Sequence, residues 1–361
     1  MKLAFITATP QNVKLGSGTF VGTAYLIDYL RSQGNAVDVY APKNPIGFMG
    51  YTATRFRWNW ALNPAVFKDY DAVVGIDMDG YTIAHRIKVP FLAYINGIIA
   101  DEAKFERGWV RTALELMARA ERVSVHRAER VIATSQYSCD RLSQLYQYDR
   151  PIEIVPPPMN VQGWDAALVT AAHMVDISGN QRPTVLCVGV QYPRKNVATL
   201  IRAAAILRKQ VPDVEIRIAS KGPEWNNLRR LAQELDLNET VTFLGYVPHQ
   251  DLVQEYRRCD VFCLPSLQEG FGIVFAEAMA TSKPIVASRS SSTPEVIQDG
   301  VQGLLATPLD PADLADKLAH LLRSPETAEA MGKAGRAKVM EFDVPAITQR
   351  FSQLLAQVCD P

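Results

Sequence analysis

Short apolar runs alternate with segments of helical periodicity along most of the chain, and this alternation constrains the fold more than any other feature. The runs lie at residues 3–8, 36–40, 71–76, 90–95 and 130–135, and again at 184–188, 214–219, 241–244, 261–264 and 284–287. Apolar runs of this length that are separated by helices are typical of buried parallel strands in βαβ units. The sequence therefore predicts an α/β protein with two doubly wound, Rossmann-like parallel sheets.

The length of the chain and one proline-rich stretch predict two domains. A chain of 361 residues exceeds the size that a single core usually supports. Pro156-Pro157-Pro158 and the weakly patterned residues after it mark a boundary. We expect an N-terminal domain over residues 1–160, a linker over 161–181 and a C-terminal domain over 182–344. The cleft between two such domains is the expected site.

The composition excludes several classes of function. The 38 basic and 38 acidic residues cancel, so no overall charge favours nucleic acid as a partner. Five scattered cysteines without a second pair or a histidine ladder argue against zinc and fit a reducing compartment. Residues 1–8 are too short for a signal peptide, and no run approaches the ~20 apolar residues of a spanning helix. We expect a cytoplasmic protein and leave membrane-surface contact open.

The strongest candidate site begins at Glu269. Residues 269–280 follow the apolar run 261–264 and predict a strand, a glycine turn and a helix. A helix that begins at such a turn presents unpaired N–H groups and a positive dipole end to an anion. Glu269 precedes the turn, and Glu277 lies among apolar neighbours where a carboxylate is costly to bury alone. A nucleotide sugar, with phosphates and hydroxyls, fits this pattern; the alternative is a purely structural turn.

A basic pair follows the first strand of the second half. Arg194 and Lys195 come shortly after the apolar run 184–188 and open a helix. An arginine fork and a lysine point charge at the carboxyl end of a parallel strand can neutralise a diphosphate. Cations placed around a departing diphosphate would stabilise its charge without a metal. A solvent-exposed basic turn is the alternative interpretation.

Two segments of the first half are candidates for binding an acceptor or a phosphate. Gly16 and Gly18 lie in a loop before a helix and could let backbone N–H groups approach a ligand. Residues 41–64 combine prolines, aromatic residues and basic residues, and we expect a long functional loop there. In this loop Trp58 and Trp60 would stack on sugar rings or touch a membrane interface, with burial in a small core as the alternative.

Other polar residues of the first half have weaker claims. Asp77 and Asp79 follow a strand and could face a divalent metal, but no third ligand is apparent, so we predict no metal site. His126 precedes the strand at 130–135 and is either a structural hydrogen-bonding group or a catalytic one. The helix expected over 108–130 carries mixed charges, typical of a solvated face, with membrane or anionic-acceptor docking as the alternative.

The second half, roughly residues 182–342, resembles the retaining GT-B glycosyltransferases of family four. The first half resembles them more loosely, through the early glycine loop and the strand before Ser135. The motifs that carry the resemblance are Gly189 with Arg194-Lys195-Asn196, Gly222-Pro223, Phe243-Leu244-Gly245-Tyr246-Val247, Pro265-Ser266, Glu269-Gly270-Phe271-Gly272 with Glu277-Ala278-Met279-Ala280, Pro294-Glu295-Val296, and Asp299-Gly300 with Gly303.

The resemblance implies a GT-B fold, retention of anomeric configuration and no metal or other cofactor. It implies that Arg194 and Lys195 bind the diphosphate, that Glu269 binds the donor sugar, and that Glu277 binds the ribose. It further implies that a last helix over 345–361 returns to the first domain. The remaining donor-binding residues that it implies are Gly270, Phe271, Gly272, Ile273 and Val274 around sugar and phosphates, and Gly245, Tyr246 and Val247 beside the base.

The sequence departs from the family at a few positions. Val190 stands where many members have an arginine, Asn96 where a histidine is common, and Ser282 and residues 290–292 where glycines are expected. Asn96 therefore joins His126 as an acceptor-side candidate. We expect hexose transfer from a nucleoside diphosphate sugar to a sugar, lipid-linked or polysaccharide acceptor in polysaccharide biosynthesis. An epimerase, a phosphorylase and a catalytically silent binding scaffold are the alternatives, and the donor base is left open.

Overall fold

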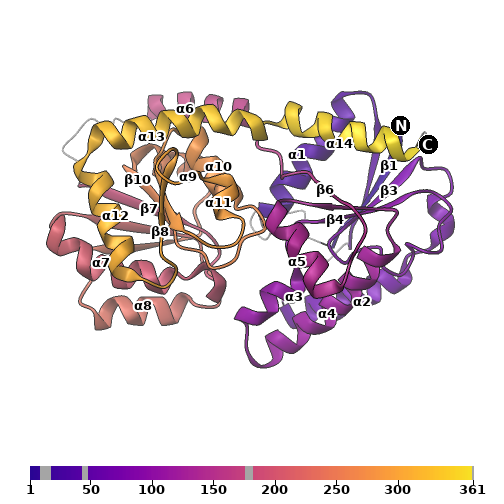
Figure 1. The fold of residues 1–361 in the computed structure, drawn as a ribbon, viewed down its shortest axis with the longest axis horizontal. Coiled ribbons are helices and arrows are strands. Elements are labelled where there is room, and N and C mark those ends of the chain that lie inside the picture. Colours follow the sequence, from indigo (N-terminus) through magenta and orange to yellow (C-terminus); the bar gives the residue numbers. More distant parts are fainter. Residues whose placement is uncertain (9–17, 43–47, 175–181, 360–361) are drawn as a thin grey trace. The chain divides into compact units, whose positions relative to one another are not determined.

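The computed structural model describes residues 1–8, 18–42, 48–174 and 182–359 and divides the chain into two compact units. The first unit consists of Met1–Pro158 with Phe342–Pro361, and the second of Met159–Glu341. Each unit contains a six-stranded parallel sheet with helices on both faces (Figure 1). The doubly wound α/β architecture expected from the alternating runs is confirmed.

The sheet of the first unit has the order β2-β1-β3-β4-β5-β6. Parallel pairing is continuous across it, for example with Leu3 opposite both Val37 and Ala72. Nearly every residue of the central strands is fully buried, as expected for strands covered on both faces. The strands are β1 (Lys2–Ile6), β2 (Ala36–Tyr40), β3 (Ala72–Ile76), β4 (Phe91–Ile95), β5 (Arg130–Ala133) and β6 (Ile152–Ile154).

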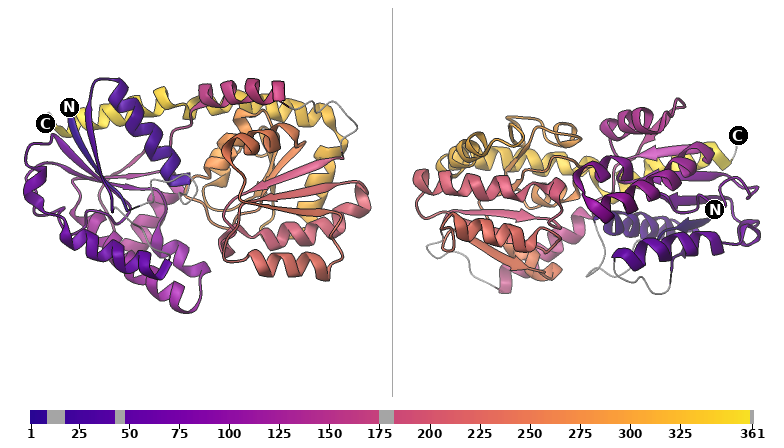
Figure 2. Two further views of the ribbon diagram at one scale, coloured as in Figure 1. Left: turned by 180° about the vertical axis from the view of Figure 1, so that it is seen from behind. Right: turned by 90° about the horizontal axis from the view of Figure 1, so that it is seen from below.

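Two groups of helices cover this sheet. On one face α1 (Gly18–Ser32) lies beside α14 (Val344–Cys359), whose Phe351 ring contacts Phe5 and Tyr94 (Figures 1 and 2). The last helix therefore packs in the first unit's core. The other elements of this unit are α2 (Phe48–Ala61), α3 (Ile99–Glu102), α4 (Gly108–Arg127) and α5 (Gln136–Tyr146), with 3-10 turns η1 (Pro64–Phe67) and η2 (Ala103–Phe105).

The expectation of a long loop over 41–64 is wrong, because Phe48–Ala61 forms helix α2. Arg55 and Asn59 lie one turn apart on its inner face and both donate to Asp79, which is fully buried. Asp79 also accepts the backbone N–H of Ala8 at the end of β1 at 2.6 Å. These buried polar contacts, together with half-buried Trp58 packed on the core, favour a helix over the loop that the prolines and aromatics predicted.

The sheet of the second unit has the order β12-β11-β10-β7-β8-β9, again with every pair parallel. Its first four strands in the sequence follow the predicted runs closely. The strands are β7 (Thr184–Val188), β8 (Glu215–Ala219), β9 (Val241–Gly245), β10 (Val261–Leu264), β11 (Ile285–Ser288) and β12 (Gly303–Ala306).

The helices of the second unit also form two groups (Figure 1). One contains α7 (Val197–Gln210), α8 (Trp225–Glu234) and α12 (Pro311–Arg323). The other contains α6 (Val161–Met174), α9 (His249–Arg258), α10 (Ile273–Ala280) and α13 (Pro325–Lys338). Shorter turns are η3 (Pro193–Lys195), α11 (Thr293–Val296) and η4 (Val339–Phe342). Within the described residues we find no helix whose length and apolar character would suit a bilayer span.

The expected linker over 161–181 differs from the structure over its first two-thirds, because helix α6 belongs to the second unit. Trp164 is 2% exposed and packs edge-on against the rings of Tyr256 and His249. Asp165 pairs with Arg336 of α13 at 2.7 Å. The burial of one large aromatic ring gives this weakly patterned segment a fixed place. Residues 175–181 lie outside the described part of the chain.

The buried contacts of Asp79 with Arg55, Asn59 and the N–H of Ala8 should dominate the stability of the first unit. Asp79→Asn keeps the side chain's shape but removes the charge from the carboxylate that the buried guanidinium of Arg55 contacts at 2.8 Å, and breaking a buried ion pair usually costs about 3–5 kcal/mol. We expect scanning calorimetry to show a clearly lowered transition. The matched control is Asp28→Asn, which removes an exposed pair with Arg31 worth about 0–1 kcal/mol. Equal transitions in the two variants would contradict this role of Asp79.

Candidate functional site

Two loops of the second unit meet because their strands are neighbours. β7 and β10 are paired in parallel, so the loops that follow them leave from the same edge of the sheet. The side-chain amide of Asn196 donates to the Pro265 carbonyl at 3.1 Å, and the N–H of Leu267 donates to the Arg194 carbonyl at 2.8 Å. These bonds join η3, which carries the basic pair, to the loop that carries Glu269.

The joined loops bring Glu269 and the two predicted cations together. The Lys195 ammonium lies 2.5 Å from Glu269 Oε1, and the Ser266 hydroxyl donates to the same oxygen at 2.7 Å. Arg194 lies 3.9 Å from Glu269 Oε2 and donates to the Gln268 carbonyl at 3.3 Å. Glu269 is only 5% exposed. Burial opposes its charged form, but Lys195 and Arg194 outweigh burial and lower the pKa of the Glu269 carboxyl.

Serines after β11 fix the backbone around Glu269. The N–H of Glu269 donates to Ser291 Oγ at 2.9 Å, and the Ser292 hydroxyl donates to the Glu269 carbonyl at 3.1 Å. The Ser290 hydroxyl donates to the Leu267 carbonyl at 2.7 Å. In the sequence these serines stand out only as replacements for glycine. Their role depends on side chains that cross between two loops, which the local pattern does not reveal.

The turn after Glu269 has the conformation that the glycine pattern predicted. Gly272 has φ of 86° at the N-cap of α10, and a Cβ there would lie 2.6 Å from the Phe275 ring. A side chain at this position would be both strained and obstructed. The helix that follows has eight residues and begins with Ile273 and Val274, whose position in the first turn leaves their N–H groups without intrahelical acceptors. Gly270 and Phe271 complete the turn.

Glu277 has surroundings opposite to those of Glu269. The hydroxyl of Tyr256, a fully buried residue of α9, donates to Glu277 Oε2 at 2.8 Å. Burial raises the pKa of the Glu277 carboxyl to about 7, and the bond from Tyr256 only partly opposes this rise. The site therefore combines an ion-paired carboxylate with one that titrates near neutrality. Sequence analysis missed Tyr256, because nothing in its helical segment distinguishes it from a core tyrosine.

The loop after β9 leaves from the same edge of the sheet. Gly245 has φ of 71°, and its carbonyl accepts the N–H of Ser220 at 2.6 Å. Tyr246 is 46% exposed and Val247 is half-buried. The Lys221 ammonium lies 5.0 Å from the centre of the Trp225 ring beside this loop. Gly245, Tyr246 and Val247 thus form a partly open surface next to a cation and an aromatic ring.

The glycines and tryptophans that were predicted to bind an acceptor or a phosphate in the first unit differ in their surroundings and exposure. Gly16 lies outside the described residues, and Gly18 is the first residue of α1. Trp58 is half-buried against the core, which agrees with the alternative of burial. Trp60 is 71% exposed. The two tryptophans therefore do not share one environment.

The polar candidates of the first unit have structural hydrogen bonds. His126 Nε2 lies 2.8 Å from the Tyr146 carbonyl, and its ring contacts the edge of Tyr148. The N–H of Asn96 donates to Asp77 Oδ1 at 2.9 Å at the carboxyl ends of β3 and β4. Among the described residues, no cluster of three or more histidine, cysteine or acidic side chains is arranged to hold a metal.

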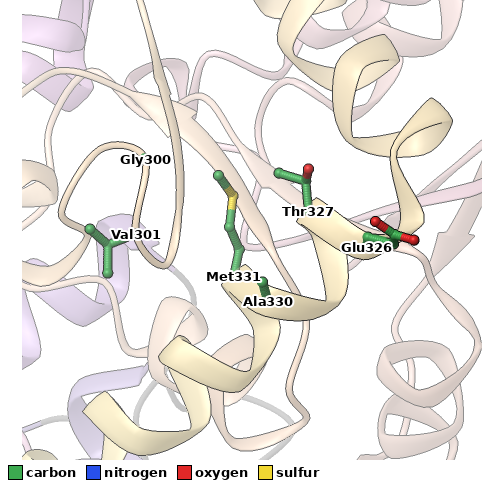
Figure 3. A pocket seen from close by; sticks show the side chains of 6 residues that line it. All are labelled: Gly300, Val301, Glu326, Thr327, Ala330 and Met331. Atoms are coloured by element: carbon green, nitrogen blue, oxygen red, sulfur yellow. The ribbon is translucent and has the colours of Figure 1, made fainter.

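One surface hollow lies apart from these residues. It has a volume of about 450 Å³ and is lined by Gly300, Val301, Glu326, Thr327, Ala330 and Met331 (Figure 3). The side chains around it are mostly small or apolar, with Glu326 as the one carboxylate among them. None of the predicted site residues lines it.

Two family models and several known proteins are similar to this chain. The family model for glycosyl transferases group 1 matches residues 175–338, and the model for Glycosyltransferase Family 4 matches residues 16–162. The chain is 32% identical over 247 residues to a GDP-mannose-dependent alpha-(1-6)-phosphatidylinositol monomannoside mannosyltransferase of Mycolicibacterium smegmatis. It is 34% identical over 230 residues to a D-inositol 3-phosphate glycosyltransferase of Nocardia farcinica. These matches span 66% and 62% of this chain, and 64% and 51% of the relatives' lengths.

Solved structures share the fold. Sucrose-phosphate synthase from Thermosynechococcus elongatus matches with a TM-score of 0.84 and 22% identity, over 99% of this chain and 98% of that one. HepE from Anabaena, solved with UDP and glucose, matches with a TM-score of 0.76 and 19% identity, over 99% and 100% of the two chains. The two family models and the sequence relatives show that the chain belongs to the family-4 glycosyltransferases, and the solved structures show that it has the GT-B fold.

Proposed function

We propose that this protein is a retaining, metal-independent hexosyltransferase that uses a nucleoside diphosphate sugar. Its acceptor would be a sugar, a lipid-linked sugar or a polysaccharide bound by the first unit. The observation that carries the proposal is the contact of Lys195 with Glu269 beside Arg194, at the carboxyl ends of two adjacent strands. The similarity to a GDP-mannose-dependent mannosyltransferase and to a D-inositol 3-phosphate glycosyltransferase supports the same class of reaction.

The cations would bind the diphosphate and stabilise it as it leaves. Lys195 and Arg194 supply two positive charges that are mostly shielded from water, where electrostatic contacts are stronger than in solution. The first-turn N–H groups of α10, at Ile273 and Val274, add a positive dipole end. As the glycosidic bond breaks, these groups would hold the negative charge that develops on the diphosphate.

The two carboxylates would hold the two sugars of the donor. Glu269, kept ionised by its cations, would accept hydrogen bonds from hydroxyls of the transferred hexose. Glu277 would accept hydrogen bonds from the ribose hydroxyls, with Tyr256 orienting its carboxyl. The loop Gly245-Tyr246-Val247 would contact the base. No protein nucleophile would be required. The acceptor hydroxyl would attack the donor sugar from the same face as the departing diphosphate, and the leaving phosphate would take the proton of that hydroxyl.

The donor panel is the direct experiment on this function. The purified protein is incubated with UDP-, GDP- and ADP-linked glucose and mannose, with and without candidate acceptors, and release of the nucleoside diphosphate is measured. Transfer with retained configuration supports the proposal. A changed sugar without acceptor would identify an epimerase, phosphate-dependent turnover a phosphorylase, and no release from any donor a silent scaffold. We place the reaction in the cytoplasm, in polysaccharide or glycolipid synthesis.

Lys195→Ala and Glu269→Ala should both reduce kcat/KM by ~10²-fold or more, the usual loss when one electrostatic contact is removed. Their effects on nucleoside diphosphate affinity should be opposite. Lys195→Ala removes a cation that binds the diphosphate and weakens binding. Glu269→Ala removes the carboxylate that neutralises Lys195 in the free protein, so binding becomes tighter while transfer falls. Calorimetric titration measures the affinities.

Matched controls are available on exposed helices of the same unit. Lys209→Ala on α7 and Glu234→Ala on α8 remove the same charges from exposed positions. We expect both controls to retain normal transfer and affinity. Near-normal turnover in Lys195→Ala, or parallel loss of nucleotide affinity in both site variants, would contradict the assigned roles.

Glu277 should make nucleotide binding depend on pH. Its carboxyl, with a pKa of about 7, is mostly protonated at pH 6 and mostly ionised at pH 8. The ionised form accepts stronger hydrogen bonds from hydroxyls. We expect affinity for the nucleoside diphosphate to rise by up to roughly tenfold over this interval, following the ionised fraction. The phosphate of the ligand also titrates in this interval. Glu277→Gln, which cannot ionise, shows how much of the pH dependence comes from that phosphate alone. Identical pH profiles for both proteins would refute this role.

A further inference from the structure

Helix α4 of the first unit exposes large apolar side chains on its outer face. Trp109 is 61% exposed and Leu116 is 49% exposed. They lie seven residues apart, two turns of the helix, and therefore form one stripe. Arg127 falls on the same stripe at the end of the helix and is exposed. The opposite side of α4 is buried through residues such as Ala118 and Val125, so the stripe belongs to the surface of the unit.

The charges around this stripe are mostly positive. The exposed acidic side chain of α4 is Glu115, which pairs with Arg111 at 2.8 Å. The second acid of the helix, Glu121, is fully buried, and burial raises the pKa of its carboxyl well above the ordinary value. It therefore lies inside the unit, away from the exposed stripe. The exposed arginines of the helix are Arg111, Arg119, Arg122 and Arg127.

Helix α2 extends the same surface. Trp60 near its end is 71% exposed, and its side chain lies beside that of Tyr81. The Arg127 guanidinium donates to the Tyr81 carbonyl at 3.3 Å, which links Trp60 to the end of α4. Arg57, one turn before Trp60, is also exposed. Both α2 and α4 lie on the same side of the first unit's sheet (Figure 1).

We propose that this surface, formed by Trp60, Trp109, Leu116 and the exposed arginines of α4, docks onto an anionic lipid bilayer. Tryptophan and leucine side chains enter the boundary between headgroups and acyl chains, while arginines beside them attract acidic headgroups. The chain as a whole is neutral, so the attraction is a property of this face. A basic nucleic-acid surface would need no exposed leucine beside its arginines, and the apolar stripe therefore favours lipid. Docking in this way would hold the first unit beside lipid-borne acceptors.

The test is binding of the full chain to vesicles, which needs neither donor nor acceptor and is independent of the proposed transfer activity. Phosphatidylcholine vesicles are compared with equimolar phosphatidylcholine and phosphatidylglycerol vesicles by co-sedimentation at low and high salt. We expect binding to the acidic vesicles that weakens as salt rises. Arg119→Glu with Arg122→Glu should reduce the partition coefficient at least about tenfold, because each basic residue near the surface contributes substantially. Trp109→Ser with Leu116→Ser should reduce binding to the acidic vesicles, while the dependence of the remaining binding on salt stays unchanged.

Three controls make the result specific. Arg119→Lys with Arg122→Lys retains the charges and should retain binding. Arg202→Glu on α7 and Val169→Ser on α6 make the same kinds of change at exposed positions of the second unit and should bind as the unaltered protein does. Circular dichroism verifies that each variant is folded. Failure of the unaltered protein to bind acidic vesicles at low salt, equal binding to neutral vesicles, or full binding by the charge-reversed variant would overturn the proposal.

Discussion

The buried contact between Lys195 and Glu269 is the interaction on which the second unit's site depends. It joins the loops after β7 and β10, which lie far apart in the sequence but leave from neighbouring strands. Burying either charge is costly, and each lowers the cost of burying the other. The contact also partly neutralises Lys195 and Arg194. Under the proposed function, a diphosphate would take over this countercharge when it binds.

The same principle organises the first unit. Asp79 follows β3 and gathers Arg55 and Asn59 from α2 together with the end of β1. A buried carboxylate with several donors fixes the carboxyl edge of the sheet. In both units one acid that is fully supplied with hydrogen bonds sets the position of the adjacent loops. Glu277 contrasts with both, because it accepts a hydrogen bond from the neutral hydroxyl of Tyr256 and has a pKa near neutrality.

Much of the fold could be predicted because apolar strand runs are local patterns. The strands around residues 3–8, 184–188 and 261–264 were found from such runs, and the glycine turn at Gly272 from its residue type. The loop predicted over 41–64 and the linker predicted over 161–181 differ from the structure, because contacts with residues distant in sequence stabilise helices there. Arg55 binds Asp79, and Trp164 packs against the ring of Tyr256. Neither partner is visible within a window of sequence.

The sequence by itself determined the alternation of strands and helices, the location of the glycine turn, and the identity of the charged residues beside it. Periodicity and residue type suffice for these features because they depend on neighbours along the chain. Only the tertiary structure decided which of those residues meet, that Ser291 and Ser292 hold the backbone of Glu269, and that Glu269 and Glu277 have opposite pKa shifts. Burial and countercharges come from strands and helices distant in sequence, and these surroundings control the ionisation of a carboxylate.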